Sequence, residues 1–286
     1  MKGEHPINWL CELLEVSRSG YYAARGRDPS ARQREDAQIA PKIALAHRRS
    51  RGTYGTPRII EDLREEGVRI GRRRCGRLMQ AQGLRGRKRH SRKPRTTDSR
   101  NTHAPAPNRL AKQPAPTSPN QIWITDITCV LSGEGWLYLA AILDLWSRRV
   151  VGWSCASTMH VSLVLSALNK ALVKRRPPIG VIHHSDRGSQ YAAHEYTQAL
   201  AAAGLIASMS RAGNCYDNAT MESFWSTCKT DTQLDHLVLP TRRDAELAIF
   251  DYIETFYNPT RRHSSLGQIS PAAFENINSR KDTQAA

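Results

Sequence analysis

The apolar positions in the second half of the chain follow two different periods. Three runs rich in β-branched and aromatic residues cover 121–131, 135–147 and 148–157, which is typical of an antiparallel meander. Helical spacing covers 160–175, 192–203, a stretch from about Asp217, and 242–257. Short apolar strands fall in IGVIHHSD (179–186) and IASMS (206–210). This order predicts an α/β fold in which a mixed five-stranded sheet is flanked by helices.

The first 85 residues show helical spacing alone, which predicts an all-α region. Residues 7–24 are predicted as two short helices with a break at Glu15–Ser19, which suits either a helix-turn-helix or an ordinary helical hairpin. Longer helices are predicted over 32–49, with an interruption at Pro41, and from about Pro57 to Glu66.

A further helix, strongly basic, is predicted over RIGRRRCGRLMQAQGL (69–84). A short turn precedes it, as in the groove-entering helix of a helix-turn-helix, although a solvated basic face gives the same pattern. The candidate DNA contacts of this region are Arg58, Arg72, Arg73, Arg74 and Arg77.

The composition of the chain changes after this helical region. Residues 86–119 lack apolar periodicity and are rich in Pro, Ser, Thr, Lys and Arg, which predicts an extended linker whose basic first half follows a DNA backbone. The predicted order is a helix-turn-helix-like segment (1–30), a helical DNA-binding domain (31–85), this linker (86–119), the α/β domain (120–276) and a tail (277–286).

The positive charge is confined to the first part of the chain. The total is +16. Residues 1–120 hold 27 Lys and Arg against 11 Asp and Glu, so 27 − 11 = +16, whereas residues 121–286 hold 15 of each. A bias of a generally basic proteome is the alternative, but it would extend into the second half. The asymmetry therefore favours an N-terminal region that binds a polyanion, joined to an ordinary globular domain.

Composition also excludes several classes of protein. Hydrophobic residues make up 40% of the chain, enough for a core, but no apolar run reaches the roughly 18–20 residues that a membrane helix needs. The six cysteines are scattered singly, without a C-x-x-C pair. We therefore expect no membrane partner, no disulfide framework and no structural zinc site, and we expect a cytoplasmic location.

Acidic residues stand at positions where a folded domain rarely places them. Asp126 interrupts the first apolar strand, in WITDIT, where its side chain shares a face with Ile124 and Thr128. Asp186 ends the fourth strand, in VIHHSDRGSQY, and strand ends are a common location for active-site groups. Each carboxylate alone has an ordinary explanation as a cap, a turn residue or a surface charge.

The third candidate, Glu222, lies in a predicted helix over DNATMESFWSTCK (217–229). At roughly 100° per residue, Glu222 and Lys229 fall on one stripe of this helix. The adjacent stripe is apolar and consists of Met221, Phe224, Trp225 and Cys228. Glu222 is therefore expected at the rim of the buried face.

Three carboxylates suit the chemistry of phosphodiester cleavage and strand transfer. Two divalent ions roughly 4 Å apart can activate the attacking oxygen and stabilise the leaving one. Mg²⁺, with Mn²⁺ as a substitute, prefers oxygen ligands. In such a site Asp126 bridges both ions, with Asp186 on one and Glu222 on the other.

At these residues the chain resembles the DDE transposases of the bacterial insertion-sequence-three family, whose catalytic half is similar to retroviral integrase. The motifs that carry the resemblance are WITDIT (123–128), LDLWSRRVVGW (143–153), HHSDRGSQY (183–191), SRAGNCYDNATMESFWSTCK (210–229) and YNPTRRHSSLGQISP (257–271). The 35 residues between Asp186 and Glu222 match the spacing of this family. VSRSGYY and RGTYGTPRI extend the resemblance to the N-terminal region.

The resemblance implies an RNase H-like integrase catalytic domain, Mg²⁺ dependence, cleavage at transposon ends and joining of 3′-hydroxyls to target DNA. It also implies that polar residues line the site or the DNA path, namely Arg187, Tyr191, Arg211, Asn214, Asn218 and Lys229. Three further residues, Arg261, Arg262 and His263, follow a helix and are expected to contact DNA or to close over the centre. Zinc ligation is the competing interpretation of His183 and His184. Because no C-x-x-C partner exists, packing and hydrogen bonding are expected there.

The resemblance also bears on the partners. Such elements usually make a longer fusion with an upstream helix-turn-helix and leucine zipper, whereas this chain starts at Met1 and shows no heptad segment. We therefore expect the downstream-frame product, acting as a homo-oligomer on DNA in the nucleoid, alone or joined to the upstream product. Two rivals are a non-catalytic DNA-binding regulator and an RNase H-like nuclease that only hydrolyses.

Overall fold

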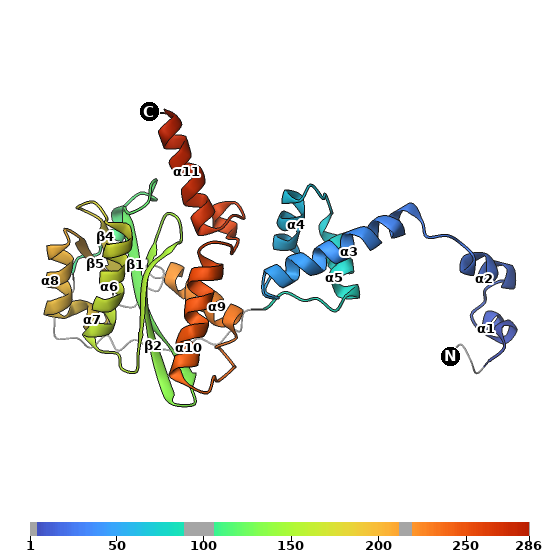
Figure 1. Cartoon of the computed structure of the whole chain (residues 1–286), viewed down its shortest axis with the longest axis horizontal. Helices are drawn as coiled ribbons and strands as arrows, with labels where there is room; N and C mark the ends of the chain where they lie inside the picture. Colours follow the sequence, from blue (N-terminus) through green and yellow to red (C-terminus); the bar gives the residue numbers. More distant parts are fainter. Residues whose placement is uncertain (1–4, 89–105, 212–218, 286) are drawn as a thin grey trace. The chain divides into compact units, whose positions relative to one another are not determined.

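The structure is a computed structural model that describes residues 5–88, 106–211 and 219–285 (Figure 1). Its internal contacts divide the chain into two compact units, Met1–Arg85 and Gly86–Ala286. The first unit is helical and the second contains the sheet. Each unit is built around its own core.

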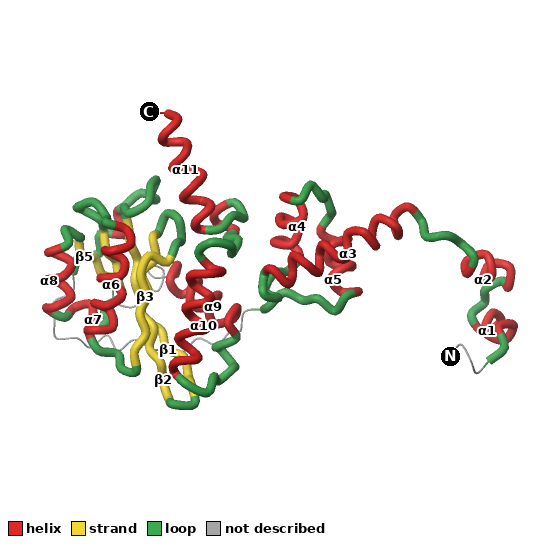
Figure 2. The backbone as a smooth tube through the Cα atoms, in the orientation of Figure 1, coloured by secondary structure: helices red, strands yellow, loops and turns green. Residues whose placement is uncertain are grey.

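The strands of the second unit are yellow in Figure 2. They form one five-stranded sheet in the order β3-β2-β1-β4-β5. They are β1 (Ile122–Ser132), β2 (Gly135–Asp144), β3 (Val150–Ala156), β4 (Ile182–Ser185) and β5 (Ile206–Met209). The first three strands pair antiparallel, whereas β4 pairs parallel with both β1 and β5. The predicted antiparallel meander and mixed five-stranded sheet are confirmed.

One face of the sheet is covered by α6 (Val161–Arg175), α7 (Ser189–Ala192) and α8 (His194–Ala202). The core on this face includes Trp123, Ile142 and Leu168, each almost completely buried. Helix α6 lies very close to β3, because a Cβ atom at Gly152 would stand 2.3 Å from the carbonyl oxygen of Ala167. A glycine at this position therefore sets how near the helix can approach the sheet.

The opposite face of the sheet carries α9 (Ala219–Thr232) and α10 (Arg242–Phe250) (Figure 1). A helix was predicted over 242–257, and the chain does stay helical there, but the winding changes to a π-helix over Asp251–Tyr257. This segment buries Tyr252, Ile253, Phe256 and Tyr257. A π-helical turn shifts the side chains of a helix around its axis, so four large side chains reach the core from seven residues.

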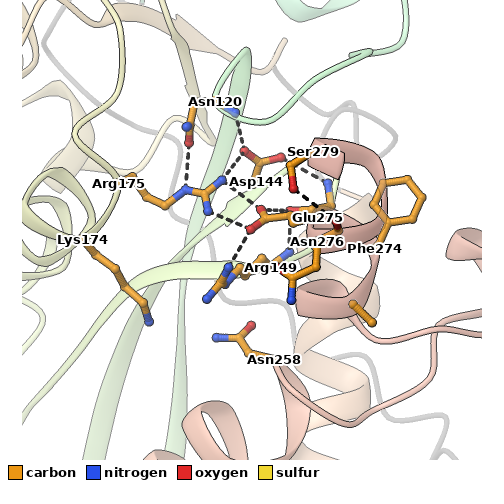
Figure 3. A network of polar contacts seen from close by, with 12 residues as sticks. Asn120, Asp144, Arg149, Lys174, Arg175, Asn258, Phe274, Glu275, Asn276 and Ser279 are labelled. Atoms are coloured by element: carbon orange, nitrogen blue, oxygen red, sulfur yellow. Dashed lines mark hydrogen bonds and ion pairs between the residues drawn. The ribbon is translucent and has the colours of Figure 1, made fainter. Parts of the chain in front are cut away.

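The C-terminal residues form a helix that the sequence pattern does not predict. Helix α11 runs over Pro271–Ala285 and so includes residues 277–285 of the predicted tail, 277–286. Apolar periodicity is weak in this stretch, and helix propensity alone is a weak signal. A polar network on Glu275 anchors the helix instead (Figure 3).

The carboxylate of Glu275 is bound on both oxygens. Oε1 accepts hydrogen bonds from Ser147 Oγ at 2.7 Å and Arg175 Nη2 at 2.9 Å, and Oε2 accepts from Arg149 Nη1 at 2.6 Å and Arg175 Nη1 at 2.9 Å. Burial by itself raises the pKa of Glu275, but the hydrogen bonds and charges of Arg175, with Arg149 and Ser147, bring that pKa below its ordinary value. The carboxylate is therefore ionised and ties α11 to α6 and to the turn before β3.

Asp144, at the end of β2, is the second carboxylate of this network. It is completely buried and accepts the backbone N–H groups of Asn120, Trp146 and Ser147. Burial raises the pKa of Asp144, against these hydrogen bonds and the charge of Arg175, whose Nη2 lies 3.6 Å from Asp144 Oδ2. The start of β1 and the β2–β3 turn are thus held at one point.

The N-terminal unit consists of α1 (Ile7–Leu13), α2 (Arg18–Arg25), α3 (Ala31–Arg49), α4 (Thr56–Glu65) and α5 (Arg72–Ala81). The last three share a core to which each contributes, for example Ile43, Leu63 and Leu78. No helix in the described residues is long and apolar enough to cross a membrane.

Pro41 does not interrupt its helix, contrary to the prediction. Helix α3 is 19 residues long, Ala31–Arg49, and Pro41 lies inside it. Proline removes one backbone hydrogen bond, to the carbonyl four residues earlier, which here belongs to Ala37. Both residues are exposed, so water can bind that carbonyl. Packing of Ile39, Ile43 and Ala46 on the other side holds the helix together.

Replacing Glu275 by alanine should destabilise the second unit by about 3–5 kcal/mol, because it leaves Arg175 buried without its main partner. Urea unfolding followed by circular dichroism measures this. Glu246→Ala is the matched control, since Glu246 forms an exposed ion pair with Arg243, and it should cost below about 1 kcal/mol. Equal effects of the two substitutions would contradict the anchoring role of Glu275.

Candidate active site

Asp126 lies in the middle of β1, on the face of the sheet that carries α9. Its Oδ1 accepts the backbone N–H of Ile127 at 2.8 Å, and its Oδ2 accepts the indole N–H of Trp225 at 3.1 Å. The neighbouring Thr125 points to the other face, where its hydroxyl lies 3.2 Å from the hydroxyl of Tyr191. The alternation of a strand therefore turns Asp126 toward α9, away from the face of Thr125.

Asp186 follows β4 directly. The parallel pairing of β1 with β4 reaches Ile124 and His184, two residues before Asp126 and Asp186, so both carboxylates follow the same end of this ladder. Asp186 Oδ1 accepts the backbone N–H of Gly188 at 2.9 Å, which holds the carboxylate in the turn that leads into α7. Both carboxylates are half-buried.

The negative charges of Asp126 and Asp186 both act on the side chain of Tyr191. It is buried, and its pKa is raised well above its ordinary value, first by burial, then by Tyr196 and by the negative charges of Asp126 and Asp186. Tyr191 was expected to line the site or the DNA path. Only 2% of it is exposed, and its hydroxyl lies 3.2 Å from the hydroxyl of Thr125, so it belongs to the core and is not available to DNA.

Glu222 lies in the first turn of α9 and is exposed. The predicted apolar stripe beside it is confirmed, because Met221, Phe224, Trp225 and Cys228 are all buried. Within the described residues, no three His, Cys, Asp or Glu side chains gather as a group that could hold a metal ion. The structure thus places Asp126 and Asp186 after the same end of the β1–β4 ladder, with α9 bound to Asp126 through Trp225, but it does not gather Glu222 into one cluster with them.

Lys229 is half-buried two turns after Glu222 on the same helix. Burial lowers the pKa of Lys229, whereas nearby Cys129, Cys228, Asp235 and Asp126 raise it. The ammonium group therefore lies within the field of Asp126, at the side of the site where α9 continues.

Two of the arginines expected to touch DNA are structural. Arg261 is 4% exposed, and its Nε donates to Asp231 Oδ2 at 2.5 Å, where the hydroxyl of Tyr252 also donates. Arg262 is 8% exposed and donates to the backbone oxygen of Gln268 at 2.7 Å. A buried guanidinium with these partners has no surface to offer a phosphate, so this part of the prediction is wrong. The RRH triplet gave no sign of which way its side chains point.

The remaining predicted contacts have mixed surroundings. His263 is half-buried, with its ring 5.0 Å from the ring of Tyr257. Arg187 is half-buried and donates to the backbone oxygen of Ser210 at 2.8 Å, whereas Arg211 is exposed. Asn214 and Asn218 lie outside the described residues.

His183 and His184 are buried at the end of β4, where they form hydrogen bonds. His183 Nε2 lies 2.7 Å from the hydroxyl of Tyr196, and the ring nitrogens of His184 lie 2.9 Å and 3.1 Å from the hydroxyls of Ser208 and Ser210. The expected role in packing and hydrogen bonding is confirmed.

In the N-terminal unit, the arginines of α5 fall into two groups. Arg72 and Arg73 are exposed at the start of the helix. Arg74 donates to Asp36 at 2.6 Å and to Glu35 at 2.8 Å, and Arg77 is also bound to Asp36. These arginines lower the pKa of Asp36, through the hydrogen bond from Arg77 first and that from Arg74 second.

Arg58 lies on α4, the helix that precedes this basic one. Its guanidinium is 5.4 Å from the ring centre of the buried Tyr54. A cation at this distance from an aromatic face is attracted to it, so the side chain is held beside the core of the unit.

Comparison with known proteins agrees with this architecture. Residues 116–215 and 203–271 each match an integrase core domain family, and residues 33–92 match a family described as an HTH-like domain. The catalytic core domain of HTLV-2 integrase, solved in complex with magnesium, aligns at 18% identity with a TM-score of 0.43, over 55% of this chain and 97% of that one. The mixed sheet, the core domain matches and the helical unit together define an enzyme of the integrase type.

Two curated relatives identify the group within that class. A 31 kDa protein of insertion element IS600 from Shigella sonnei is 48% identical over 93% of this chain and 97% of its own length. The transposase InsF of insertion sequence IS3A from Escherichia coli is 39% identical, over 97% of this chain and 96% of its own length. The chain belongs to the insertion-sequence-three family of transposases and is a polynucleotidyl transferase that acts on DNA.

The folded state should lose stability below neutral pH because of His183. Burial, with His184 beside it, lowers the pKa of His183 to about 3, against about 6.5 in an unfolded chain. As the pH falls through about 6.5, His183 therefore takes up a proton in the unfolded state but not in the folded state. The free energy of unfolding should fall by about 2 kcal/mol between pH 7 and pH 5. Urea unfolding at both pH values measures the loss, and His183→Gln should reduce it by that amount. An unchanged loss in this variant would show that His183 is not the group responsible.

Proposed function

We propose that this transposase cleaves DNA at the ends of an insertion element and joins the 3′-hydroxyls to target DNA at a divalent-metal centre formed by Asp126, Asp186 and Glu222. The observation that supports this proposal is the parallel pairing of Ile124 with His184, two residues before Asp126 and Asp186, with the helix of Glu222 bound to Asp126 through Trp225.

The donor set fits Mg²⁺ or Mn²⁺. All three groups are carboxylates, the oxygen ligands that these ions prefer. Asp126 and Asp186 each keep acceptor capacity beyond the N–H groups that they bind, since a carboxylate has about four lone-pair sites. When bound, a pair of such ions supplies activation of the attacking oxygen and stabilisation of the leaving one. Exposure of Glu222 on its helix leaves its carboxylate accessible to an ion and to DNA.

The surrounding cations suit a DNA substrate. Lys229 lies on α9, two turns after Glu222, and Arg211 is exposed two residues after the end of β5. These side chains offer charge to phosphates that extend past the carboxylates. As with other enzymes that join two DNA ends to a target, we propose a homo-oligomer on DNA, with the upstream-frame product as a further partner.

The N-terminal unit is proposed to hold the DNA through the start of α5. Arg72 and Arg73 are exposed there, and a helix N-terminus that follows a turn is the part of a helix-turn-helix that reaches DNA. Arg74 is held by two carboxylates of α3, so we assign it to the packing of the unit.

Replacing Asp126, Asp186 or Glu222 by alanine should abolish donor-end cleavage and strand transfer while leaving DNA binding intact. Cleavage and joining of a labelled end are followed on a gel, and binding by mobility shift. Glu195→Ala is a matched control, because Glu195 is an exposed acid in the first turn of α8, and it should behave as the wild type does. Full activity in any of the three variants would exclude the proposed centre, and cutting without joining in the wild type would favour a nuclease.

Arg72→Ala and Arg73→Ala should each weaken DNA binding for all sequences and reduce the slope of log K against log salt by about 1. Arg74→Ala removes the same charge from the same helix. Because Arg74 is ion-paired, this variant should lower the melting temperature of the unit and leave the salt slope unchanged. Fluorescence anisotropy at several salt concentrations measures the slopes. The same slope change in all three variants would refute the division of these arginines into two groups.

A further inference from the structure

Trp225 is an unusual neighbour for an acid of a reaction centre. Its indole N–H donates to Asp126 Oδ2 at 3.1 Å, while the other oxygen, Oδ1, accepts the backbone N–H of Ile127 at 2.8 Å. Each oxygen of Asp126 thus accepts an N–H, and the two donors come from different elements, β1 and α9.

The indole ring itself has little freedom to move. Trp225 is 7% exposed, and its ring lies 4.7 Å from the ring of Phe224. Phe224 in turn packs edge-on against Tyr257 at 5.0 Å. The donor that binds Asp126 is therefore part of an aromatic cluster that spans α9 and the π-helical segment after α10.

The position of Trp225 along α9 links two of the proposed metal ligands. It follows Glu222 by three residues, and residues three apart are neighbours on a helix surface. The hydrogen bond therefore holds the first turns of α9, which carry Glu222, against the strand that carries Asp126.

We propose that Trp225 is a positioning residue of the reaction centre, which orients the Asp126 carboxylate toward the metal ions and holds the first turns of α9 against β1. This inference rests on the proposed function. A carboxylate offers about four lone-pair sites, so the bond from the indole orients the ligand without blocking it. Removal of partners of this kind typically costs 10–100-fold in metal affinity or activity.

Trp225→Phe tests the proposal, because it keeps a large ring and removes the N–H donor. The matched control is Trp153→Phe, since the indole N–H of Trp153 also donates to a carboxylate, Glu254, at 3.0 Å, and Trp153 is 9% exposed. Both variants lose the same kind of bond, but only one of these bonds belongs to the reaction centre.

Two measurements are compared across the wild type and both variants of the full chain. Mn²⁺ binding in the absence of DNA is followed by electron paramagnetic resonance of the free ion, and the Mg²⁺ concentration that gives half-maximal strand transfer is determined separately. We expect Trp225→Phe to weaken Mn²⁺ binding and to raise the Mg²⁺ requirement by about 10–100-fold, with Trp153→Phe equal to the wild type in both.

Equal Mn²⁺ binding and equal Mg²⁺ dependence in Trp225→Phe and Trp153→Phe would overturn the proposal. If Trp225→Phe does not fold, as shown by circular dichroism, benzothienylalanine at position 225 replaces only the N–H by sulfur and decides the question. A wild type that binds Mn²⁺ but does not join DNA would refute the proposed function, while the difference in Mn²⁺ binding would still decide the role of Trp225.

Discussion

The candidate site depends on β1, which pairs antiparallel with β2 on one side and parallel with β4 on the other. The parallel pairing brings β4 beside the first residues of β1, two residues before Asp126 and Asp186. Because side chains alternate across a strand, the same strand gives one face to the core under α6 and the other to α9. The pleat of β1 therefore turns Asp126 toward the helix that carries Trp225.

Buried ion pairs hold the parts of this domain that contain few apolar residues. Glu275 fastens α11 through Arg175 and Arg149, and Asp231 fastens the segment after the π-helix through Arg261. A buried charge is costly without its partner, so each pair admits one arrangement of the chain around it. Apolar packing supplies the stability of the sheet, and these pairs specify where the irregular C-terminal segments attach to it.

Some arginines of this protein are exposed and others are bound in ion pairs, and only the neighbours of each side chain show which arginine is which. Arg72 and Arg73 are exposed, whereas Arg74 in the same run is bound by Glu35 and Asp36. Arg261 was grouped with the DNA contacts because it follows a helix in a basic triplet, yet it is buried. The ion pairs do not change the net charge of residues 1–120, which is +16 and still favours a polyanionic partner.

The sequence by itself determined the strands and most helices in their order along the chain, the position of Asp126 within a strand and the apolar stripe of α9, because these follow from the periods of two and 3.6 residues. The sequence also indicated the family, because the motifs that carry the resemblance are continuous segments of the chain. Only the tertiary structure decided that α3 passes through Pro41, that α11 forms, that Tyr191 and Arg261 are buried, and that Trp225 binds Asp126. These features arise from contacts between residues distant in sequence, for which no local period exists.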